Sequence, residues 1–155
     1  MIPALLIVGA AALLVNAISK DDEDVQIQRK RLFISHSWKL SSSDYRKFVS
    51  KLKYETNFYN HSIPQNKAFN TWDKEELREI FRQQMAGCQK IFVLAHSSLR
   101  KNSYVGVELE IASSMGKQII AVKPYGQQAI PTFIKKYATE VISNNITSII
   151  RVVQS

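Results

Sequence analysis

Residues 91–122, IFVLAHSSLRKNSYVGVELEIASSMGKQIIAV, contain two apolar runs separated by one long amphipathic segment. The first run, residues 91–95, is apolar on both faces, which is typical of a central strand in a parallel sheet. Residues 102–116 begin with capping residues and end at Gly116, so they predict a helix. A second apolar run follows at residues 118–122. The stretch therefore predicts a strand, a crossover helix and a parallel strand, which is the repeating unit of an α/β domain.

The same alternation of strand and helix extends through most of the chain. We expect further strands at residues 32–34, 57–63 and 140–142, and further helices beginning near residues 41–44 and 73 and covering 146–153. Strands separated by helices predict a parallel sheet with right-handed crossovers and helices on both faces. The expected fold class is therefore a three-layer α/β domain, which we place at residues 31–155.

Glu108 falls on the wrong side of the predicted helix for a charged residue. At 100° per residue, the apolar side chains cover one broad arc with Glu108 near its middle, whereas Gly106 and Glu110 lie on the opposite, solvated arc. An ionised carboxylate on the apolar arc loses its hydration unless another group compensates it. One interpretation is a mis-phased helix or an ion pair with a lysine or arginine. The other is a functional carboxylate in a cleft near a helix N-terminus, whose dipole favours an anion.

The composition indicates one basic domain. The chain has 155 residues and a net charge of +8. Without Lys20 and the acidic run at residues 21–24, 20 basic and 9 acidic side chains remain, a net +11. This charge favours anionic partners such as nucleotides, phosphates or acidic lipids, and the scattered basic residues make nucleic acid the weaker option. Cys88 is the only cysteine, which excludes an internal disulfide and a zinc site built on cysteines.

Residues 2–18, IPALLIVGAAALLVNAI, are apolar except for Asn16 and carry no charge. A membrane-spanning helix needs about 17–25 such residues. Basic residues occur only after this run, which favours a cytoplasmic location for the C-terminal side. A cleaved signal peptide is the alternative, because Ala17 ends a Val-x-Ala triplet and the apolar run is of modest length. We expect an uncleaved, single-pass anchor at residues 1–19 in the inner membrane, a charged linker at 20–30 and a cytoplasmic domain.

Polar and aromatic residues follow the predicted strands, at the edge where ligands bind in parallel sheets. They are Ser35, His36, Ser37 and Trp38, then His96, Ser97 and Ser98, then Lys123 and Tyr125. A basic pocket with hydroxyls, an aromatic side chain and one buried carboxylate suits a nucleotide with ribose hydroxyls. Each residue also has a structural interpretation, as an aromatic cover, a satisfied histidine or a turn-forming serine. The sequence contains neither a glycine-rich phosphate loop nor a nucleophile elbow, and little in it supports a metal site.

Several short motifs occur in order along residues 31–153. They are FISHSW at 33–38, Asp44 and Tyr45, HSIP at 61–64, KEEL at 74–77, YVGVELEIA at 104–112, GKQIIAVKPYGQ at 116–127 and NNITSIIR at 144–151. Together they resemble the TIR-like domain family of the Thoeris anti-phage system. The resemblance implies a flavodoxin-like fold and a bacterial TIR enzyme that cleaves NAD⁺ at the nicotinamide–ribose bond. It also implies that the product is a cyclic ADP-ribose-type signal made after phage infection.

The catalytic glutamate of this family belongs to an aromatic-x-x-x-Glu motif, which corresponds here to Tyr104 and Glu108; most relatives have tryptophan at the aromatic position. The resemblance therefore implies that Glu108 is catalytic, stabilising an oxocarbenium-like transition state and holding the ribose hydroxyls. We expect the aromatic site residues to line a dry pocket that favours cyclisation over hydrolysis, and the polar ones to steer the pyrophosphate. The predicted substrate-binding residues are Phe33, Ser35, His36, Trp38 and Tyr104.

Two other functions are also compatible with the sequence. In the first alternative, the domain is a non-enzymatic TIR-like interaction module, and Glu108 is a structural ion-pair partner. In the second, the protein is a membrane-anchored effector that senses a nucleotide. The expected partners are NAD⁺ or a related nucleotide, the membrane, a second copy of the chain and a downstream effector protein. We expect no metal, no cofactor other than NAD⁺ as substrate, and no nucleic acid. NAD⁺ turnover by the purified protein distinguishes the enzyme from the other two.

Overall fold

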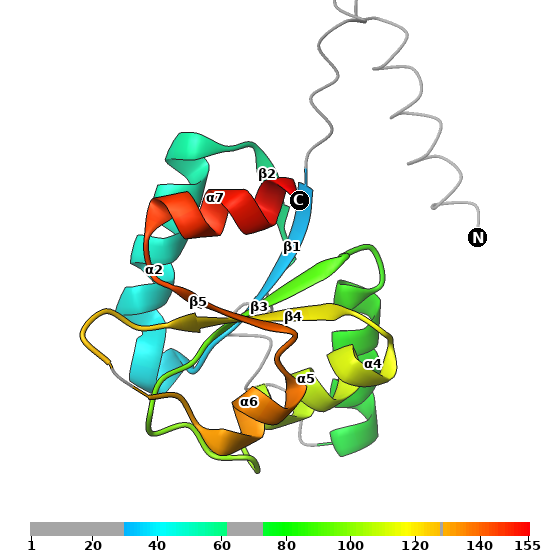
Figure 1. The fold of residues 1–155 in the computed structure, drawn as a ribbon. Helices are drawn as coiled ribbons and strands as arrows, with labels where there is room; N and C mark the ends of the chain where they lie inside the picture. The colour runs from blue at the N-terminus through cyan, green and yellow to red at the C-terminus, as the bar shows by residue number, and fades with distance from the viewer. Residues whose placement is uncertain (1–29, 62–72, 128) are drawn as a thin grey trace, which may run out of the picture.

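A computed structural model describes residues 30–61, 73–127 and 129–155, apart from the side chain of Trp38. Five parallel strands form one sheet in the order β2-β1-β3-β4-β5. The strands are β1 (Lys30–Ser35), β2 (Phe58–Asn60), β3 (Lys90–Leu94), β4 (Gln118–Lys123) and β5 (Glu140–Ser143). The sheet runs through the middle of the domain (Figure 1). The predicted parallel α/β sheet is confirmed, and its strand order is that of flavodoxin-like folds.

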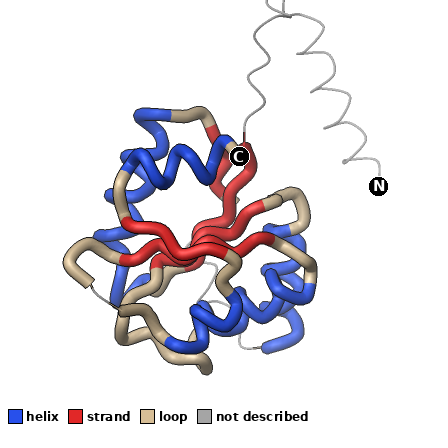
Figure 2. Tube along the Cα trace, in the orientation of Figure 1, coloured by secondary structure: helices blue, strands red, loops and turns tan. Residues whose placement is uncertain are grey.

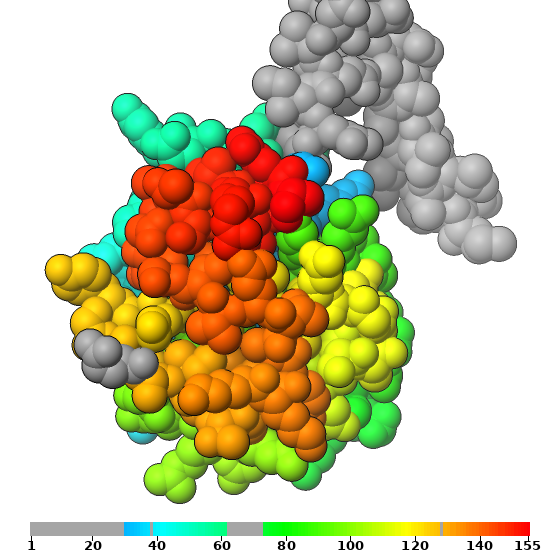
Figure 3. All heavy atoms as spheres, in the orientation of Figure 1, coloured from blue at the N-terminus to red at the C-terminus, as the bar shows by residue number. Residues whose placement is uncertain are grey.

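Helices cover both faces of this sheet, as the tube view shows (Figure 2). One face carries α2 (Trp38–Glu55) and α7 (Ile146–Gln154), and the other carries α4 (Lys74–Met85), α5 (Tyr104–Ser114) and α6 (Thr132–Tyr137). Side chains fill the openings between the ribbons, so that the visible face is closed over α5, α6 and α7 (Figure 3). The three-layer arrangement is therefore as predicted.

Strand alternation divides the core into two clusters. On β1, Phe33 packs in the cluster under α4, α5 and α6, whereas Ile34 packs in the cluster under α2 and α7. All five residues of β3 are buried, because helices cover both of its faces. The strand order places β3 in the middle of the sheet, which confirms the central position predicted for residues 91–95.

Local capping confirms two of the predicted helix starts. The carboxylate of Asp73 accepts hydrogen bonds from the backbone N–H groups of Glu75 (2.8 Å) and Glu76 (3.3 Å) at the start of α4. Ser103 caps α5, and Gly116 follows that helix with φ +69°, a conformation that favours glycine. The two caps fix where α4 and α5 begin beside each other.

Helix α2 begins earlier than its cap candidates at residues 41–44 predicted. The Oγ atom of Ser37 accepts a hydrogen bond from the Leu40 N–H (3.1 Å), and the helix starts at Trp38. Ser41 has φ −135° and ψ 24°, so the helix is kinked where the sequence analysis expected it to start. The serine run thus marks a break inside α2.

Helix α6 is absent from the sequence expectation. It has only six residues, too few for a periodic apolar stripe to stand out. Its signals are Pro131 directly before the first turn and the single buried residue Ile134.

In the three described ranges, no helix combines the length and the apolar character needed to cross a bilayer. The anchor predicted at residues 1–19 lies outside the described residues, as does the linker except for Lys30, the first residue of β1.

Candidate functional site

The strand order creates a switch point between β1 and β3. After β1 the chain turns to α2 on one face of the sheet, and after β3 it leads to α5 on the other face. The two connections separate at the carboxyl ends of these adjacent strands, where flavodoxin-like sheets bind their ligands. The polar groups beside this edge are therefore the candidates for a functional site.

Glu108 lies in the second turn of α5, on its sheet-facing side. Its exposed fraction is 8%, and it is the only buried carboxylate among the described residues. Its Oε2 atom has no hydrogen-bond partner in that part of the chain. The helical phasing that predicted a buried Glu108 is confirmed, and the buried acid retains an unused acceptor.

Ser35 ends β1 and faces the same layer as Glu108. It is 1% exposed, and strand alternation places it on the same side of the sheet as Phe33. Burial raises the pKa of Glu108 to about 8, and the Ser35 hydroxyl acts in the opposite direction. The Ser35 Oγ atom completes no hydrogen bond of ordinary geometry within the described residues. The structure thus brings together a carboxyl group and a hydroxyl that both have capacity for a ligand.

The ion-pair interpretation of Glu108 has no support in the described residues. The ion pairs among them join Arg78 to Glu110, Arg82 to Glu79, and Arg151 to Glu140. An uncompensated buried carboxyl group is held mainly in its neutral form, in accordance with its raised pKa.

The opposite arc of α5 differs from the prediction in two respects. The side chain of Glu110 is 55% exposed, as expected, but it accepts a hydrogen bond from Arg78 of α4 at 3.0 Å. Gly106 is buried rather than solvated, because the backbone of Lys101 packs against it. A Cβ atom at Gly106 would lie 1.8 Å from the Lys101 carbonyl oxygen, so only glycine fits there.

His36 lies on the other side of the sheet from Glu108. Its ring stacks on Tyr45 of α2 with a centroid distance of 3.8 Å and an interplanar angle of 7°. Its Nδ1 atom is 3.3 Å from the carbonyl oxygen of Ile34. Burial lowers the pKa of His36 to about 4, although this backbone hydrogen bond opposes the shift. A ring that is neutral at pH 7 supplies no positive charge for the predicted steering of a pyrophosphate.

Two of the three predicted aromatic residues, Phe33 and Tyr104, do not line the same pocket. Phe33 is 1% exposed and belongs to the core, whereas Tyr104 is 41% exposed. Tyr104 lines a groove of about 780 Å³ between the starts of α4 and α5, together with Leu77 and Val107. Glu108 does not line this groove. Trp38 begins α2, and its side chain lies outside the description.

Gln127 is a residue at this edge that the sequence analysis did not single out as a site residue. Its side chain joins the loop after β4 to the loop after β3, through the N–H of Ser97 and the carbonyl of Ala95. The sequence feature that could have indicated it is the Pro-x-Gly turn at residues 124–126, because such a turn fixes the direction of the residue that follows it. His96, in the same β3 loop, accepts a hydrogen bond from the Ser98 N–H at 3.1 Å and thereby forms a local turn.

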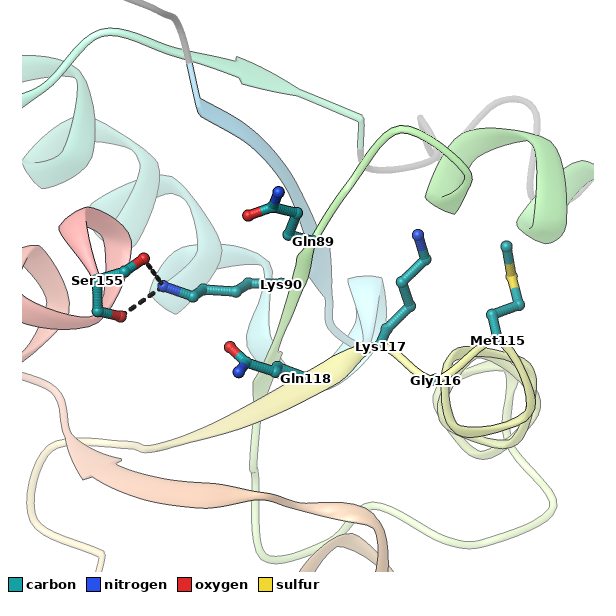
Figure 4. A pocket seen from close by; sticks show the side chains of 7 residues that line it. All are labelled: Gln89, Lys90, Met115, Gly116, Lys117, Gln118 and Ser155. Carbon is teal, nitrogen blue, oxygen red and sulfur yellow. Dashed lines mark hydrogen bonds between the residues drawn. The ribbon is translucent and has the colours of Figure 1, made fainter.

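A second cavity, of about 540 Å³, lies at the opposite edge of the sheet (Figure 4). Lys90 reaches from β3 toward the end of α7, where its ammonium group donates to the carbonyls of Val152 and Ser155 and to the Ser155 hydroxyl. Lys117 donates to the Ala86 carbonyl, after α4, at 3.1 Å. Both lysines are engaged at helix C-termini, so this cavity is explained by helix capping.

In the part of the chain that the structure describes, no three His, Cys, Asp or Glu residues lie close enough together to bind one metal ion.

Among solved structures, the CMP N-glycosidase BcmB of Clostridium botulinum is similar, with a TM-score of 0.47 and 13% identity over 81% of this chain and 98% of that chain. This low score supports no conclusion about the reaction, and no curated protein matches the sequence. The family model described as Thoeris protein ThsB, TIR-like domain, matches residues 33–129, from β1 to the loop after β4. Because that match covers more than half of the sequence, the chain belongs to the TIR-like domain family of the Thoeris protein ThsB.

Proposed function

We propose that this TIR-like domain cleaves the bond between nicotinamide and ribose in NAD⁺ and forms a cyclic ADP-ribose-type signal in anti-phage defence. The observation that carries the proposal is the burial of Glu108 beside Ser35, at the switch point and without a basic partner among the described residues. Membership of the Thoeris family supports the choice of NAD⁺ through the resemblance described above.

The chemistry required of Glu108 is electrostatic. When the glycosidic bond breaks, its electron pair moves to the pyridinium nitrogen, nicotinamide leaves as a neutral molecule, and positive charge develops at the ribose C1′ atom. A carboxylate in a water-excluded site stabilises that charge more strongly than it would in water. The cationic ring of the substrate also favours ionisation of the carboxyl group, because an adjacent positive charge lowers a carboxyl pKa.

A nucleophile of the ADP-ribose itself then closes the ring at C1′, whereas attack by water gives linear ADP-ribose. The Ser35 hydroxyl has spare hydrogen-bonding capacity beside Glu108 and serves to hold a ribose hydroxyl during either attack.

The test is NAD⁺ turnover by the purified chain and two variants, with nicotinamide, cyclic product and ADP-ribose separated by chromatography. Glu108→Gln keeps the size of the side chain but removes the charge, and its turnover falls by about 10²–10³-fold. Glu110→Gln is the matched control, two residues away and exposed, and it retains activity. Equal turnover in the two variants refutes the catalytic role of Glu108, and a parent chain without turnover favours the non-enzymatic module.

We also infer that residues 1–19 anchor the domain on the cytoplasmic side of the inner membrane, where a second copy of the chain and a downstream effector protein are its expected partners. The support is the uncharged apolar run followed by basic residues. Membrane fractionation with reporter fusions tests the anchor. Recovery of a shortened, soluble periplasmic chain shows instead that the segment is a cleaved signal peptide.

A further inference from the structure

The side chain of Gln127 uses both N–H donors and its carbonyl oxygen to join two loops at the candidate site. Its Oε1 atom accepts from the backbone N–H of Ser97 at 2.9 Å. Its Nε2 atom donates to the carbonyls of Ala95 and Ala129, both at 2.6 Å. Two donors and one acceptor of the amide are therefore matched by backbone groups of opposite kind.

This contact lies where the backbone pairing of β3 with β4 ends. The last backbone bond between these segments runs from the Ala95 N–H to the Val122 carbonyl at 3.0 Å. Beyond this bond, the segment after β3 leads to α5 and the segment after β4 leads to α6. The Gln127 amide then donates to the carbonyl of Ala95 and accepts from the N–H of Ser97. These side-chain hydrogen bonds replace the backbone pair that would come next in the sheet.

A tight turn directs the Gln127 side chain. The Gln127 N–H donates to the Pro124 carbonyl at 3.1 Å, and Gly126 has φ +78°, in the region that favours glycine. Tyr125, at the tip of the turn, is 95% exposed, so packing of its side chain does not determine the course of the turn. The turn thus presents Gln127 toward β3 at a fixed angle.

The segment held by Gln127 leads directly to the helix that carries Glu108. It turns through hydrogen bonds from Leu99 to His96 and from Ser103 to Arg100, and Ser103 then caps α5. Its far end is fixed by the close packing of Lys101 on Gly106. The loop is therefore held at both ends, by Gln127 at β3 and by Gly106 in the first turn of α5.

We propose that Gln127 is a positioning residue, which fixes the loop after β3 and through it the placement of Glu108 against the ribose. This inference rests on the proposed function. An amide is required, because a carboxylate at residue 127 would face the carbonyls of Ala95 and Ala129 with negative charge in place of N–H donors. Displacement of a catalytic group by about 1 Å lowers turnover by about 10²-fold.

The experiment compares Gln127→Glu with Gln118→Glu in the purified chain. Gln118 is exposed at the start of β4, whereas Gln127 lies in the loop after this strand, so the Gln118→Glu variant adds the same charge away from the site. Nicotinamide release is measured from pH 5 to pH 8. At pH 8 the Gln127→Glu variant loses about 10- to 100-fold in kcat with a smaller change in KM. The control stays within about two-fold of the parent.

The pH profile separates positioning from a general loss of structure. A protonated Glu at residue 127 regains one O–H donor, so the ratio of variant to parent activity rises as the pH falls. A Gln127→Leu variant, which has no donor at any pH, shows no such recovery. At pH 8 the backbone amide of Ser97 also exchanges its hydrogen faster in Gln127→Glu than in the parent.

Full activity of Gln127→Glu beside an active parent overturns the positioning role and leaves the proposed function intact. Unchanged exchange at Ser97, or an equal and pH-independent loss in the Glu and Leu variants, also overturns it. A parent chain that does not release nicotinamide overturns both inferences at once.

Discussion

Replacing Glu108 by glutamine stabilises the domain in a pH-dependent manner. In the folded chain burial raises the pKa of Glu108 to about 8, from an ordinary value of 4.5. The folded state therefore holds this proton over a range in which the unfolded state has released it. The stability associated with the neutral carboxyl is fully present below about pH 4.5 and is lost as the pH rises toward 8.

The size of the effect follows from the two pKa values. Each pH unit between them costs the parent about 1.4 kcal/mol in free energy of unfolding. The accumulated cost at pH 7 is about 3 kcal/mol, and it approaches a limit of about 5 kcal/mol above pH 8. Glutamine cannot ionise, so Glu108→Gln removes this slope. Any fixed difference in packing between glutamine and a neutral glutamate is the same at every pH and does not change the slope.

The assay is urea unfolding of the parent, Glu108→Gln and Glu110→Gln between pH 4.5 and pH 8, followed by circular dichroism. The stability of Glu108→Gln relative to the parent increases steadily with pH. Glu110→Gln differs from the parent by less than about 1 kcal/mol, because it removes only an exposed pair with Arg78. Parallel curves for the parent and Glu108→Gln would show that the carboxyl group is not buried in a neutral form, and would refute the reasoning.

Three further predictions concern activity and packing. The kcat/KM for NAD⁺ rises with pH around a pKa of about 8, since the free enzyme must ionise Glu108; a flat profile of nicotinamide release contradicts this. Gly106→Ala lowers the free energy of unfolding by about 1–3 kcal/mol or more, because the new Cβ meets the Lys101 carbonyl. Urea unfolding checks it, with the exposed Ser113→Ala as control. Lys90→Met removes donors from the end of α7 and costs about 1–3 kcal/mol, seen as a lower melting temperature; an unchanged temperature contradicts the capping role.

Periodicity predicted the features that depend on one element at a time. The burial of Glu108 and the exposure of Glu110 follow from 100° per residue along α5, and the sheet follows from the order of apolar runs. The capping position of Asp73 depends only on its neighbours in the chain, so it was also predictable.

Features that depend on contacts between elements were not predictable in this way. Gly106 has no side chain that would reveal its burial, which results from the path of Lys101. Ser35 and His36 are adjacent in the sequence, but strand alternation sends them to opposite faces of the sheet, so only Ser35 reaches Glu108. The role of Gln127 depends on how far apart the β3 and β4 loops lie after their strands end.

The strand order also sets a time scale for synthesis of the domain. β1 lies between β2 and β3, and its Ile34 pairs with Phe92, which follows 58 residues later. At about 5–20 residues per second, a ribosome needs roughly 3–12 s to supply that partner after β1 has been made. During this interval the apolar faces of β1 lack their central neighbour β3. Glu108, which lies beside the Ser35 hydroxyl in the folded domain, has not yet been synthesised either. The first strand of the domain therefore needs protection from aggregation while the chain is still growing.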